Sequence, residues 1–526
     1  MNFNSYNFIF VFLPLCIVCY RIVASLHIGN GKDHKGTLLK LLLTAFSVAF
    51  YAYASVRSLA LIAVSLSVNY CFISASLCRQ LSAKQVKALK AVGVIFNLAV
   101  LGYFKYYNFF MGSVSWFMGR DYTLKSILLP LGISYITFQQ ISVVIDTANG
   151  EIEKVPPLDY VLYIMYFPKV LSGPIANFEE MEAQFADIAE RSKWNAEQIF
   201  RGAALLILGM GEKCIFAAWM SSSVNFAYDN VATLSFGEGL LCMFCMPLAM
   251  FFDFCGYCDM GMGLSRMFGI ELPVNFRNPF KTLTIVAYWR NWHITLTRFM
   301  GKYVYIPLGG NRKGRARMCA NMMLVYILSG LWHGANATYI LWGALNGLIY
   351  VPVKLVEDAK KRKAKQAGRS YIRDDFGLRL PPVKRFAARL GNYIVNSMMF
   401  IPFMASSLAE AGVYIKSMWS SLVTAISSGN ALSAFVIRED YLKVFETDEL
   451  WYVLKGLHIA AHSLAPVLCM VVIFGITFAA GMFSKSAQDI AAKMKINVKN
   501  AVLLGALLSW CILTYSQVTT FIYVNF

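Results

Sequence analysis

Apolar residues occur along the chain in long runs that short polar stretches separate. A run of roughly 20 apolar residues is long enough to cross the hydrocarbon layer of a membrane as a helix. The pattern predicts about twelve such spans, near residues 7–25, 38–55, 58–78, 91–110, 158–176, 198–221, 236–258, 318–335, 336–353, 391–406, 463–483 and 500–522. The expected fold class is therefore all-α, as a polytopic membrane protein whose first span is retained.

Two further apolar segments, 124–145 and 281–310, are interrupted by residues that break helices: Pro130, Gly132, Pro307, Gly309 and Gly310. Irregular backbone at membrane depth persists only where protein or a water-filled cavity surrounds it. We therefore expect both segments to be re-entrant.

Composition agrees with this pattern. Hydrophobic residues make up 58% of the chain, charged residues 15%, and the mean hydropathy is +0.53, whereas soluble domains are about 45–50% apolar and about 25% charged. Because the apolar excess extends along the whole length, lipid is the expected solvent. We expect a single integral membrane domain over 1–526.

The net charge of +19 lies in the loops between the apolar runs. This distribution follows the positive-inside rule and argues against a nucleic-acid partner. Residues 354–390 are the most basic stretch and are predicted to be a cytoplasmic loop. Residues 407–460 are a candidate extracytoplasmic segment, with an amphipathic helix over 411–423. In this orientation both termini lie outside.

The cysteine spacing at Cys242, Cys245, Cys255 and Cys258 resembles that of a four-thiolate zinc site. The stretch around these residues is almost continuously apolar, so no soluble zinc knuckle forms there. We expect no metal site and no bound cofactor.

His293 lies in the stretch YWRNWHITLTRFMGKYVYIPLGGNRKG, where Trp289, Arg290, Trp292 and His293 crowd into one helical turn. A charge beside aromatic residues, ahead of a Pro–Gly–Gly break, indicates a structured site at the cytoplasmic face. An interfacial aromatic belt with a hydrogen-bonded histidine explains the pattern equally well.

His333 lies in SGLWHGANATYILWGALNG, between two apolar runs. An ionisable residue at membrane depth is a functional candidate, although a buried histidine bonded to a carbonyl is the alternative. Asn336 would share its face if the helix continued, and Gly330 and Gly334 allow close approach of backbone or ligand. A neutral imidazole there suits a general base that acts on a hydroxyl acceptor of an activated acyl group.

Several longer stretches resemble the membrane-bound O-acyltransferase superfamily, and in particular its alginate O-acetyltransferase branch. They are FNSYNFIFVFLPLCIVCY, LGYFKYYNFF, LPLGISYITFQQISVVIDTANGEI, YFPKVLSGPI, FFDFCGYCDMGMGLSRMFGIELPVNFRNPF, the two histidine stretches and the ending FIYVNF. The resemblance implies a ring of tilted helices around a thin central funnel.

The resemblance also implies roles for the candidate residues. His333 aligns with the family's catalytic histidine, and His293 with its second histidine. Trp332, Asn336, Arg290, Trp289 and Trp292 are the expected substrate-binding residues. Arg290 and the basic cluster 312–317 are candidates for binding donor phosphates or an acidic carrier, while ordinary positive-inside charge remains the alternative for the cluster.

In this family the donor is a cytoplasmic thioester, either acetyl-CoA or an acyl carrier protein, and the acceptor lies outside. In this branch a second, extracytoplasmic protein of the SGNH type completes transfer to a polysaccharide. The expected location is the cytoplasmic (inner) membrane, as a multi-pass protein. The stretch Phe400–Ala411 lacks the arginine that is usual in this branch, which puts the partner and acceptor region in question.

Alternative functions remain open. D-alanyl transfer to teichoic acid from a carrier protein is the nearest, although the YIPLGGNRKG stretch favours acetyl transfer. A lipid acyltransferase, a transporter and a passive scaffold are further alternatives. A transporter is expected to carry broken helices at corresponding positions of two halves, and the breaks at 130–132 and 307–310 do not pair in this way.

Overall fold

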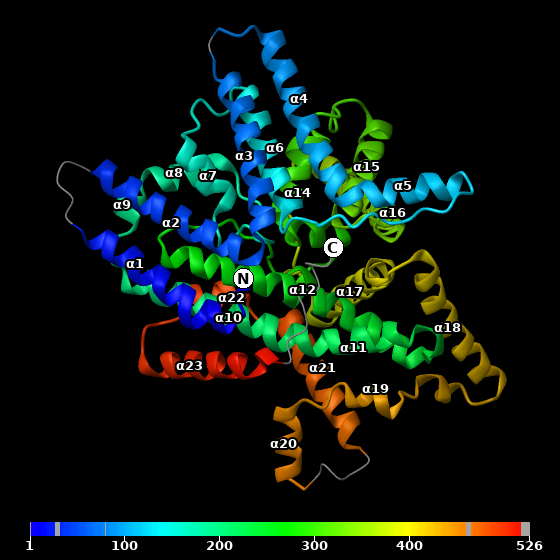
Figure 1. The fold of residues 1–526 in the computed structure, drawn as a ribbon. Helices are drawn as coiled ribbons and strands as arrows, with labels where there is room; N and C mark the ends of the chain where they lie inside the picture. The colour runs from blue at the N-terminus through cyan, green and yellow to red at the C-terminus, as the bar shows by residue number, and fades with distance from the viewer. Residues whose placement is uncertain (1, 27–31, 79, 459–463, 517–526) are drawn as a thin grey trace. The chain divides into compact units, whose positions relative to one another are not determined.

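The computed structural model describes residues 2–26, 32–78, 80–458 and 464–516, and every regular element in these ranges is a helix (Figure 1). The helices group into two compact units. Unit 1 comprises Met1–Met210, Tyr257–Val274 and Ala487–Ser516, and unit 2 comprises, in its described part, Gly211–Gly256 and Asn275–Ser486. All the candidate site residues lie in unit 2.

Eight helices in the described residues are long and apolar enough to cross a membrane, and each overlaps a predicted span. They are Phe8–Ser25, Asp33–Ala54, Val56–Ser76, Ala83–Phe117, Ala196–Asp229, Phe236–Met267, Ala337–Gln366 and Ala465–Phe483. The chain is thus an all-helical membrane protein, as the apolar pattern predicted.

The other predicted spans differ from expectation. The prediction of a span at 158–176 is wrong, because α7 (Pro157–Met165) has only 9 residues and the chain turns before Pro168. Helices α15 (Arg315–His333) and α17 (Pro382–Met404) are long enough but more polar than the eight. Helix α23 (Val498–Leu513) is short at 16 residues, and residues 517–522 of that predicted span lie outside the described part.

The two segments predicted to be interrupted are interrupted. Residues 120–130 carry no regular structure, and Gly132, at a φ of 69°, precedes the almost wholly buried α6 (Ile133–Ala148). The 281–310 segment breaks into short pieces: η5 (Pro279–Lys281), α13 (Ile285–Asn291), α14 (Ile294–Met300) and η6 (Gly301–Tyr305). The break between α13 and α14 falls at Trp292–His293, where no proline or glycine announced it.

Helices α15 and α16 (Ala337–Gln366) form a tight antiparallel pair in unit 2. A Cβ atom placed on Gly330 would lie 2.1 Å from the carbonyl oxygen of Tyr339, and one on Gly343 would lie 2.3 Å from that of Tyr326. Only glycine allows backbones to approach so closely, as in other membrane helix pairs. The same contacts fix the register of the two helices.

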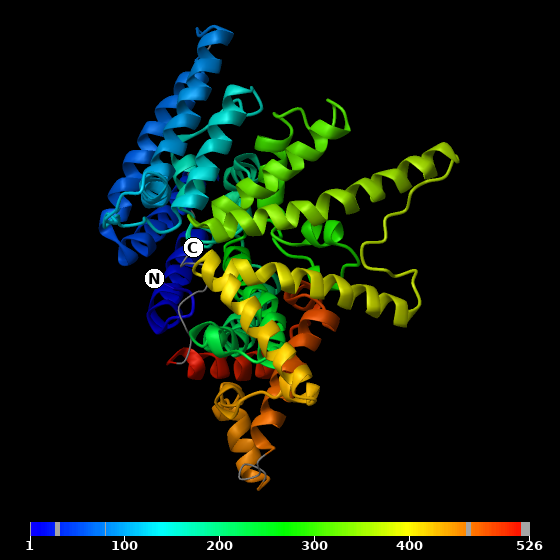
Figure 2. The same ribbon diagram turned by 90° about the vertical axis from the view of Figure 1, so that its right-hand side faces the viewer.

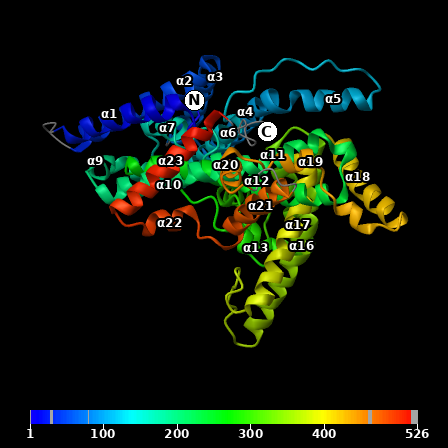
Figure 3. The ribbon, with the colours of Figure 1, turned by 90° about the horizontal axis from the view of Figure 1, so that it is seen from below.

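The basic stretch 354–390 is mostly helical. Helix α16 continues to Gln366 and α17 begins at Pro382, so the non-helical part is limited to residues 367–381. The connection extends at the far end of the two helices (Figure 2), which lie side by side (Figure 3). The predicted amphipathic helix at 411–423 lies within α18 (Leu408–Ser427), followed by α19 (Glu439–Lys443) and α20 (Asp448–Gly456).

The four cysteines with zinc-like spacing all lie on one helix, α12 (Phe236–Met267). At 1.5 Å per residue, Cys242 and Cys258 are separated by roughly 24 Å along its axis. Thiolates that bind one zinc ion must each lie about 2.3 Å from it. The helical geometry therefore prevents the four from sharing one ion.

Candidate functional site

The two candidate histidines lie together in unit 2. The ring centroids of His293 and His333 are 6.3 Å apart, although 40 residues separate them in sequence. Both side chains are buried, with exposed fractions of 1% for His293 and 5% for His333. His293 comes from the junction of α13 and α14, and His333 is the last residue of α15.

The backbone at His293 is held in the left-handed region, at a φ of 45°. This conformation is uncommon for a residue with a side chain and persists where the surroundings enforce it. Here the neighbouring backbone segment at Asn275 and Arg277 enforces it. Ile294 N–H donates to the carbonyl of Asn275 at 2.9 Å, and Arg277 N–H donates to the carbonyl of Asn291 at 3.0 Å. The break between α13 and α14 is therefore fixed from both sides.

The side chain of Asn275 determines which nitrogen of His293 carries the proton. Asn275 Oδ1 accepts hydrogen bonds from the backbone N–H of Thr295 (3.3 Å) and from Thr295 Oγ1 (2.9 Å). A backbone N–H can only donate, so the amide oxygen is the atom that faces it. The same oxygen lies 3.1 Å from His293 Nδ1, which must then be protonated to donate.

It follows that Nε2 of His293 carries the lone pair. Nε2 is buried and has no hydrogen-bond partner among the described residues. His293 lies outside the eight candidate spans, and burial lowers the pKa of its imidazole to about 3. The ring is thus neutral near pH 7 and is a proton acceptor at Nε2.

His333 lies in a box of aromatic rings. Its ring centroid is 5.0 Å from that of Trp332, 5.2 Å from Trp342 and 5.4 Å from Phe403. Trp342 belongs to α16 and Phe403 to α17. Three helices therefore place His333, and the glycine contacts between α15 and α16 bring Trp342 to it.

The expectation that Asn336 shares a helical face with His333 is wrong. Helix α15 ends at His333 because Gly334 adopts an extended conformation. Asn336 instead caps α16: its Oδ1 accepts from Thr338 N–H at 3.2 Å, and its Nδ2 donates to the carbonyl of Ser406 at 2.6 Å. Its observed contacts connect the start of α16 to the chain after α17.

The three tryptophans have different surroundings. The ring of Trp332 lies 5.9 Å from that of His293 and 5.0 Å from that of His333, so it touches both histidines. Trp289 packs against Trp342 at 5.6 Å and lines a cavity beside His293. Trp292 packs in a cluster with Phe251, Phe276, Tyr288 and Phe400, and Phe276 of this cluster stacks on His293.

Arg290 is engaged by two carboxylates. Its guanidinium donates to both oxygens of Glu357, at 2.9 and 3.1 Å, and to Asp375 at 2.7 Å. Such a bidentate pair uses the planar geometry of arginine fully. Because its charge is already compensated, Arg290 joins α13 to α16 and to residue 375, and it is poorly suited to binding a donor phosphate.

A cavity of about 220 Å³ reaches His293 from one side of the α15–α16 pair. Its lining residues are Trp289, His293, Leu296, Thr297, Met300, Gly301, Tyr305, Met322, Val325, Tyr326, Ser329, Tyr350 and Lys354. The register of the pair places Lys354 near the beginning of α15 and Ser329 near its end. The cavity therefore runs along α15 from a charged end toward the histidines.

A second, more polar cavity of about 370 Å³ lies near Lys354, at the charged end of the first. It is lined by Asn311, Gly314, Arg315, Met318, Asp358, Lys361, Arg362 and Lys365. Lys354 of the first cavity and Asp358 of the second form an ion pair at 2.7 Å. The basic cluster predicted at 312–317 thus contributes Arg315 to a cavity that α16 shares.

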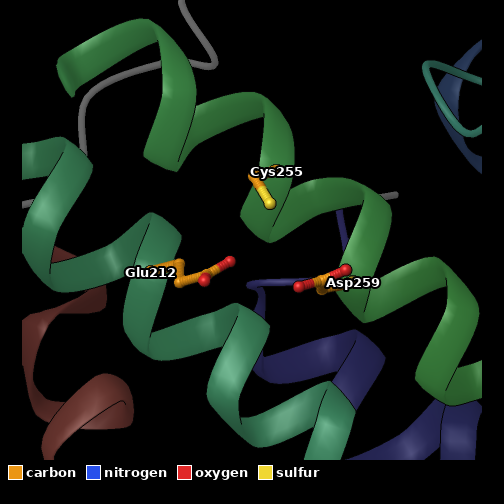
Figure 4. Close-up of side chains that lie close together, drawn as sticks. All are labelled: Glu212, Cys255 and Asp259. Atoms are coloured by element: carbon orange, nitrogen blue, oxygen red, sulfur yellow. The ribbon is translucent and has the colours of Figure 1, made fainter. Parts of the chain in front are cut away.

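Acidic and thiol groups also meet elsewhere. Glu212, in η3 (Glu212–Ala217), and Cys255 of α12 place ligand atoms within 4.8 Å of each other, and Asp259 follows Cys255 by one turn of α12 (Figure 4). Each of the three has other interaction partners. We assign no metal site to them.

The sequence missed two residues of the site. Asn275 lies 18 positions before the histidine that it orients, in an extended stretch that carries no pattern for such a role. Ser329 occurs inside the predicted span 318–335, where a serine is unremarkable. Only the structure shows that it lines a cavity together with His293.

Comparison with known proteins gives related sequences. The pattern of the membrane-bound O-acyltransferase family matches residues 48–360, a range that contains both histidines. The chain is 34% identical over 372 residues to a peptidoglycan O-acetyltransferase of Helicobacter pylori, covering 66% of this chain and 69% of the relative. It is 34% identical over 358 residues to a probable alginate O-acetylase of Pseudomonas aeruginosa, covering 66% and 65%.

A more distant relative has another printed activity. The chain is 25% identical over 298 residues to a teichoic acid D-alanyltransferase of Streptococcus thermophilus, covering 54% of this chain and 69% of the relative. The chain thus spans about two thirds of the length of each of these relatives.

Proposed function

The chain belongs to the membrane-bound O-acyltransferase family, and we propose that it moves an acetyl group from a cytoplasmic thioester across the membrane for O-acetylation of an extracytoplasmic polysaccharide. The relatives at 34% identity are O-acetyltransferases of peptidoglycan and alginate by name. Their names support a saccharide hydroxyl as the acceptor class.

The observation that carries the proposal is the pair of buried imidazoles, 6.3 Å apart, of which His293 lines a cavity. His333 is the catalytic base that removes the proton from the hydroxyl that accepts the acyl group. His293 acts on the donor side, because it lines the cavity and its Nε2 has no hydrogen-bond partner among the described residues. Trp332 touches both rings and holds them apart at this spacing.

The donor is a thioester, either acetyl-CoA or an acyl carrier protein. The cavity beside His293 accepts its thioester arm, and Trp289 forms one wall. The neighbouring basic cavity, with Arg315, Lys361 and Arg362, suits the phosphates of either donor. From Arg315 to Ser329 the cavities follow α15 for roughly 21 Å, a length that suits an extended arm with two amide linkages.

The acceptor approaches from the other side. By the positive-inside rule residues 354–390 are cytoplasmic and 407–460 are extracytoplasmic. An extracytoplasmic partner of the SGNH type would receive the acetyl group there and complete its transfer to the polysaccharide. A cavity of about 490 Å³, which Lys416, Ser420 and Arg438 help to line, lies between this segment and residues 232–238.

We also infer how the chain is inserted. Helices α15 and α17 cross the membrane beside the eight apolar helices, giving about ten crossings, and the shorter α23 would raise the number to about eleven. Polar residues on α15, such as Asn321 and Ser329, are tolerated because they are buried in protein. The site of insertion is the bacterial cytoplasmic membrane.

D-alanyl transfer to teichoic acid is the second candidate, supported by the relative at 25% identity. The two reactions share the thioester donor and the hydroxyl acceptor, so the histidine geometry serves both. They differ in the acyl group, which direct analysis of the cell surface distinguishes.

The test measures ester-linked acetyl groups on cell-surface polysaccharide by NMR. A deletion strain is complemented with wild type, with His333→Ala, or with His34→Ala as the control. His34 is an exposed histidine on α2 (Lys32–Ala54). We expect acetyl groups to disappear on deletion and to return with wild type and His34→Ala only. Unchanged acetylation in the deletion strain would refute acetyl transfer, and loss of ester-linked D-alanine instead would establish the second candidate.

A further inference from the structure

Ser329 occupies the position between the donor cavity and His333. The face of α15 that lines the cavity is formed by Met322, Val325, Tyr326 and Ser329. The next residue on this face, one helical turn beyond Ser329, is His333. Ser329 is therefore the last cavity residue on α15 before the aromatic box.

The surroundings of the Ser329 side chain suit a nucleophile. It is 9% exposed and lines the cavity together with His293. Serine within a helix often donates back to the carbonyl one turn earlier, yet no hydrogen bond of the Ser329 hydroxyl occurs within the described ranges. A hydroxyl in this setting is available to a base and to a substrate.

The cavity has a second aliphatic hydroxyl, that of Thr297, one turn after His293 on α14. Thr297 differs from Ser329 because it is exposed. A nucleophile in an acyl transfer benefits from exclusion of water, which would otherwise hydrolyse the ester that forms. Ser329 is thus the better placed of the two. Ser67, an exposed serine inside the helix Val56–Ser76 that does not line the cavity, serves as the control.

We propose that Ser329 Oγ is a nucleophile that carries the acyl group as an ester between the donor and the acceptor. In the first step Oγ attacks the thioester carbonyl, the C–S bond breaks, and the thiol leaves. Nε2 of His293 takes the hydroxyl proton and passes it to the departing sulfur. The products are an acylated Ser329 and a free thiol, and no oxidant or reductant is needed.

In the second step the acceptor hydroxyl attacks the Ser329 ester. His333 takes the proton of that hydroxyl, the bond between Oγ and the acyl carbon breaks, and the proton returns to Oγ. This division assigns one base to each half of the reaction. It also agrees with the positions of the two histidines, because His293 lines the donor cavity and His333 lies one turn further along α15.

The proposal rests on the acyl-transfer function proposed above and deepens it. It accounts for transfer between substrates on opposite sides of the membrane, because the acyl group can leave the donor cavity before the acceptor arrives. No residue of the segment 407–460 lines the cavity among the described residues. Phe403, which touches His333, instead lies at the end of α17 that leads to this segment.

The test uses full-length protein in cells, where the natural donor is present. His333→Ala protein is purified from membranes, and the peptide that contains Ser329 is analysed by tandem mass spectrometry. We expect an acyl ester on Ser329, because the first step proceeds and the second does not. The double variant His333→Ala/Ser329→Ala is expected to lack it, and His333→Ala/Ser67→Ala to retain it.

Polysaccharide acetylation is measured in parallel. Ser329→Ala is expected to fall to the level of the deletion strain, while Ser67→Ala remains near wild type at equal protein abundance. Ser329→Cys keeps a nucleophile of similar size and is expected to form a hydroxylamine-sensitive thioester. It therefore tests the intermediate even if Ser329→Ala misfolds. Absence of any acyl group at residue 329, or substantial acetylation with Ser329→Ala, overturns the intermediate. The proposed function fails separately, if deletion leaves acetylation unchanged.

Discussion

Asn275 and His293 form a hydrogen bond of 3.1 Å between Oδ1 and Nδ1, and this bond sets the chemistry of the imidazole. The oxygen is identified by the N–H of Thr295, which donates to the same atom. The lone pair of His293 therefore lies on Nε2, a buried atom with no hydrogen-bond partner among the described residues. An orienting partner of this kind is a common requirement of histidines that act as bases.

The first prediction concerns Asn275. Asn275→Ala removes the acceptor, so the ring loses its fixed proton position and its orientation. We expect acetyl transfer to fall about 10- to 100-fold, by analogy with the loss of the orienting partner of a metal-bound histidine. The measurement is the initial rate in membranes at matched protein amounts. An unchanged rate would show that the tautomer of His293 has no part in transfer.

Asn275→Asp gives a second prediction, on pH dependence. In wild type, burial keeps the pKa of His293 at about 3, so the base stays neutral down to about pH 4. A carboxylate at 275 stabilises the imidazolium and raises the pKa of His293. Activity should therefore decline at acidic pH in this variant, as pH falls through the raised pKa. Identical pH profiles for the two proteins would contradict the assignment.

The third prediction separates the chemistry of His293 from its backbone strain. Asparagine tolerates the left-handed conformation better than most residues, so His293→Asn keeps the φ of 45° at little cost while removing the base. We expect normal abundance and a loss of about 100-fold or more in transfer. Low abundance with normal activity per molecule would instead assign His293 a structural role.

Arg290 is the subject of the fourth prediction. Arg290→Ala leaves Glu357 and Asp375 without the cation that they share, and the loss is expected to cost about 1–3 kcal/mol of stability. Thermal inactivation in detergent should occur at lower temperature, with an unchanged KM for the donor at temperatures where the variant is folded. Arg290→Lys should recover little, because lysine lacks the bidentate geometry.

The opposite result would revive the expectation drawn from sequence. If Arg290 bound donor phosphates, Arg290→Ala would raise the KM for the donor and leave thermal inactivation unchanged. The triple variant Arg290→Met, Glu357→Gln, Asp375→Asn is the control. It removes the unpaired carboxylates together with the arginine, and it should be more stable than Arg290→Ala.

The apolar pattern predicted the all-helical fold and the eight long helices because lipid requires long uniform runs. It failed at 158–176, where apolar residues are buried in protein rather than exposed to lipid, and the chain turns near Pro168. Hydropathy alone cannot distinguish these two solvents. The pattern also ended the predicted span at 353, although α16 continues to Gln366. Charged residues mark the end of an apolar run, but they do not mark the end of a helix.

For the site too, the sequence predicted some features and missed others. His293 and His333 stood out because each is an ionisable group in an apolar setting. Their proximity, the role of Asn275 and the position of Ser329 depend on contacts between distant parts of the chain, which no local pattern encodes. Asn336 was misplaced because the helix was assumed to pass Gly334, whose extended conformation ends it.

The last prediction concerns the helix pair that holds His333. A Cβ on Gly343 would lie 2.3 Å from the carbonyl oxygen of Tyr326, so Gly343→Ala forces α15 and α16 apart. Because Trp342 adjoins Gly343 and touches His333, the aromatic box should shift with the helices. We expect loss of transfer and about 1–3 kcal/mol of lost stability.

Gly475→Ala is the matched control, because Gly475 lies inside α21 (Ala465–Phe483) with no atom within 4 Å of an added Cβ. Both substitutions gain the same helix propensity, about 1 kcal/mol, so only the contact differs. Transfer rate and thermal inactivation in detergent are measured for both. Equal behaviour of the two variants would mean that the close packing of α15 on α16 does not position His333, and the aromatic box would then have to be held by α17 alone.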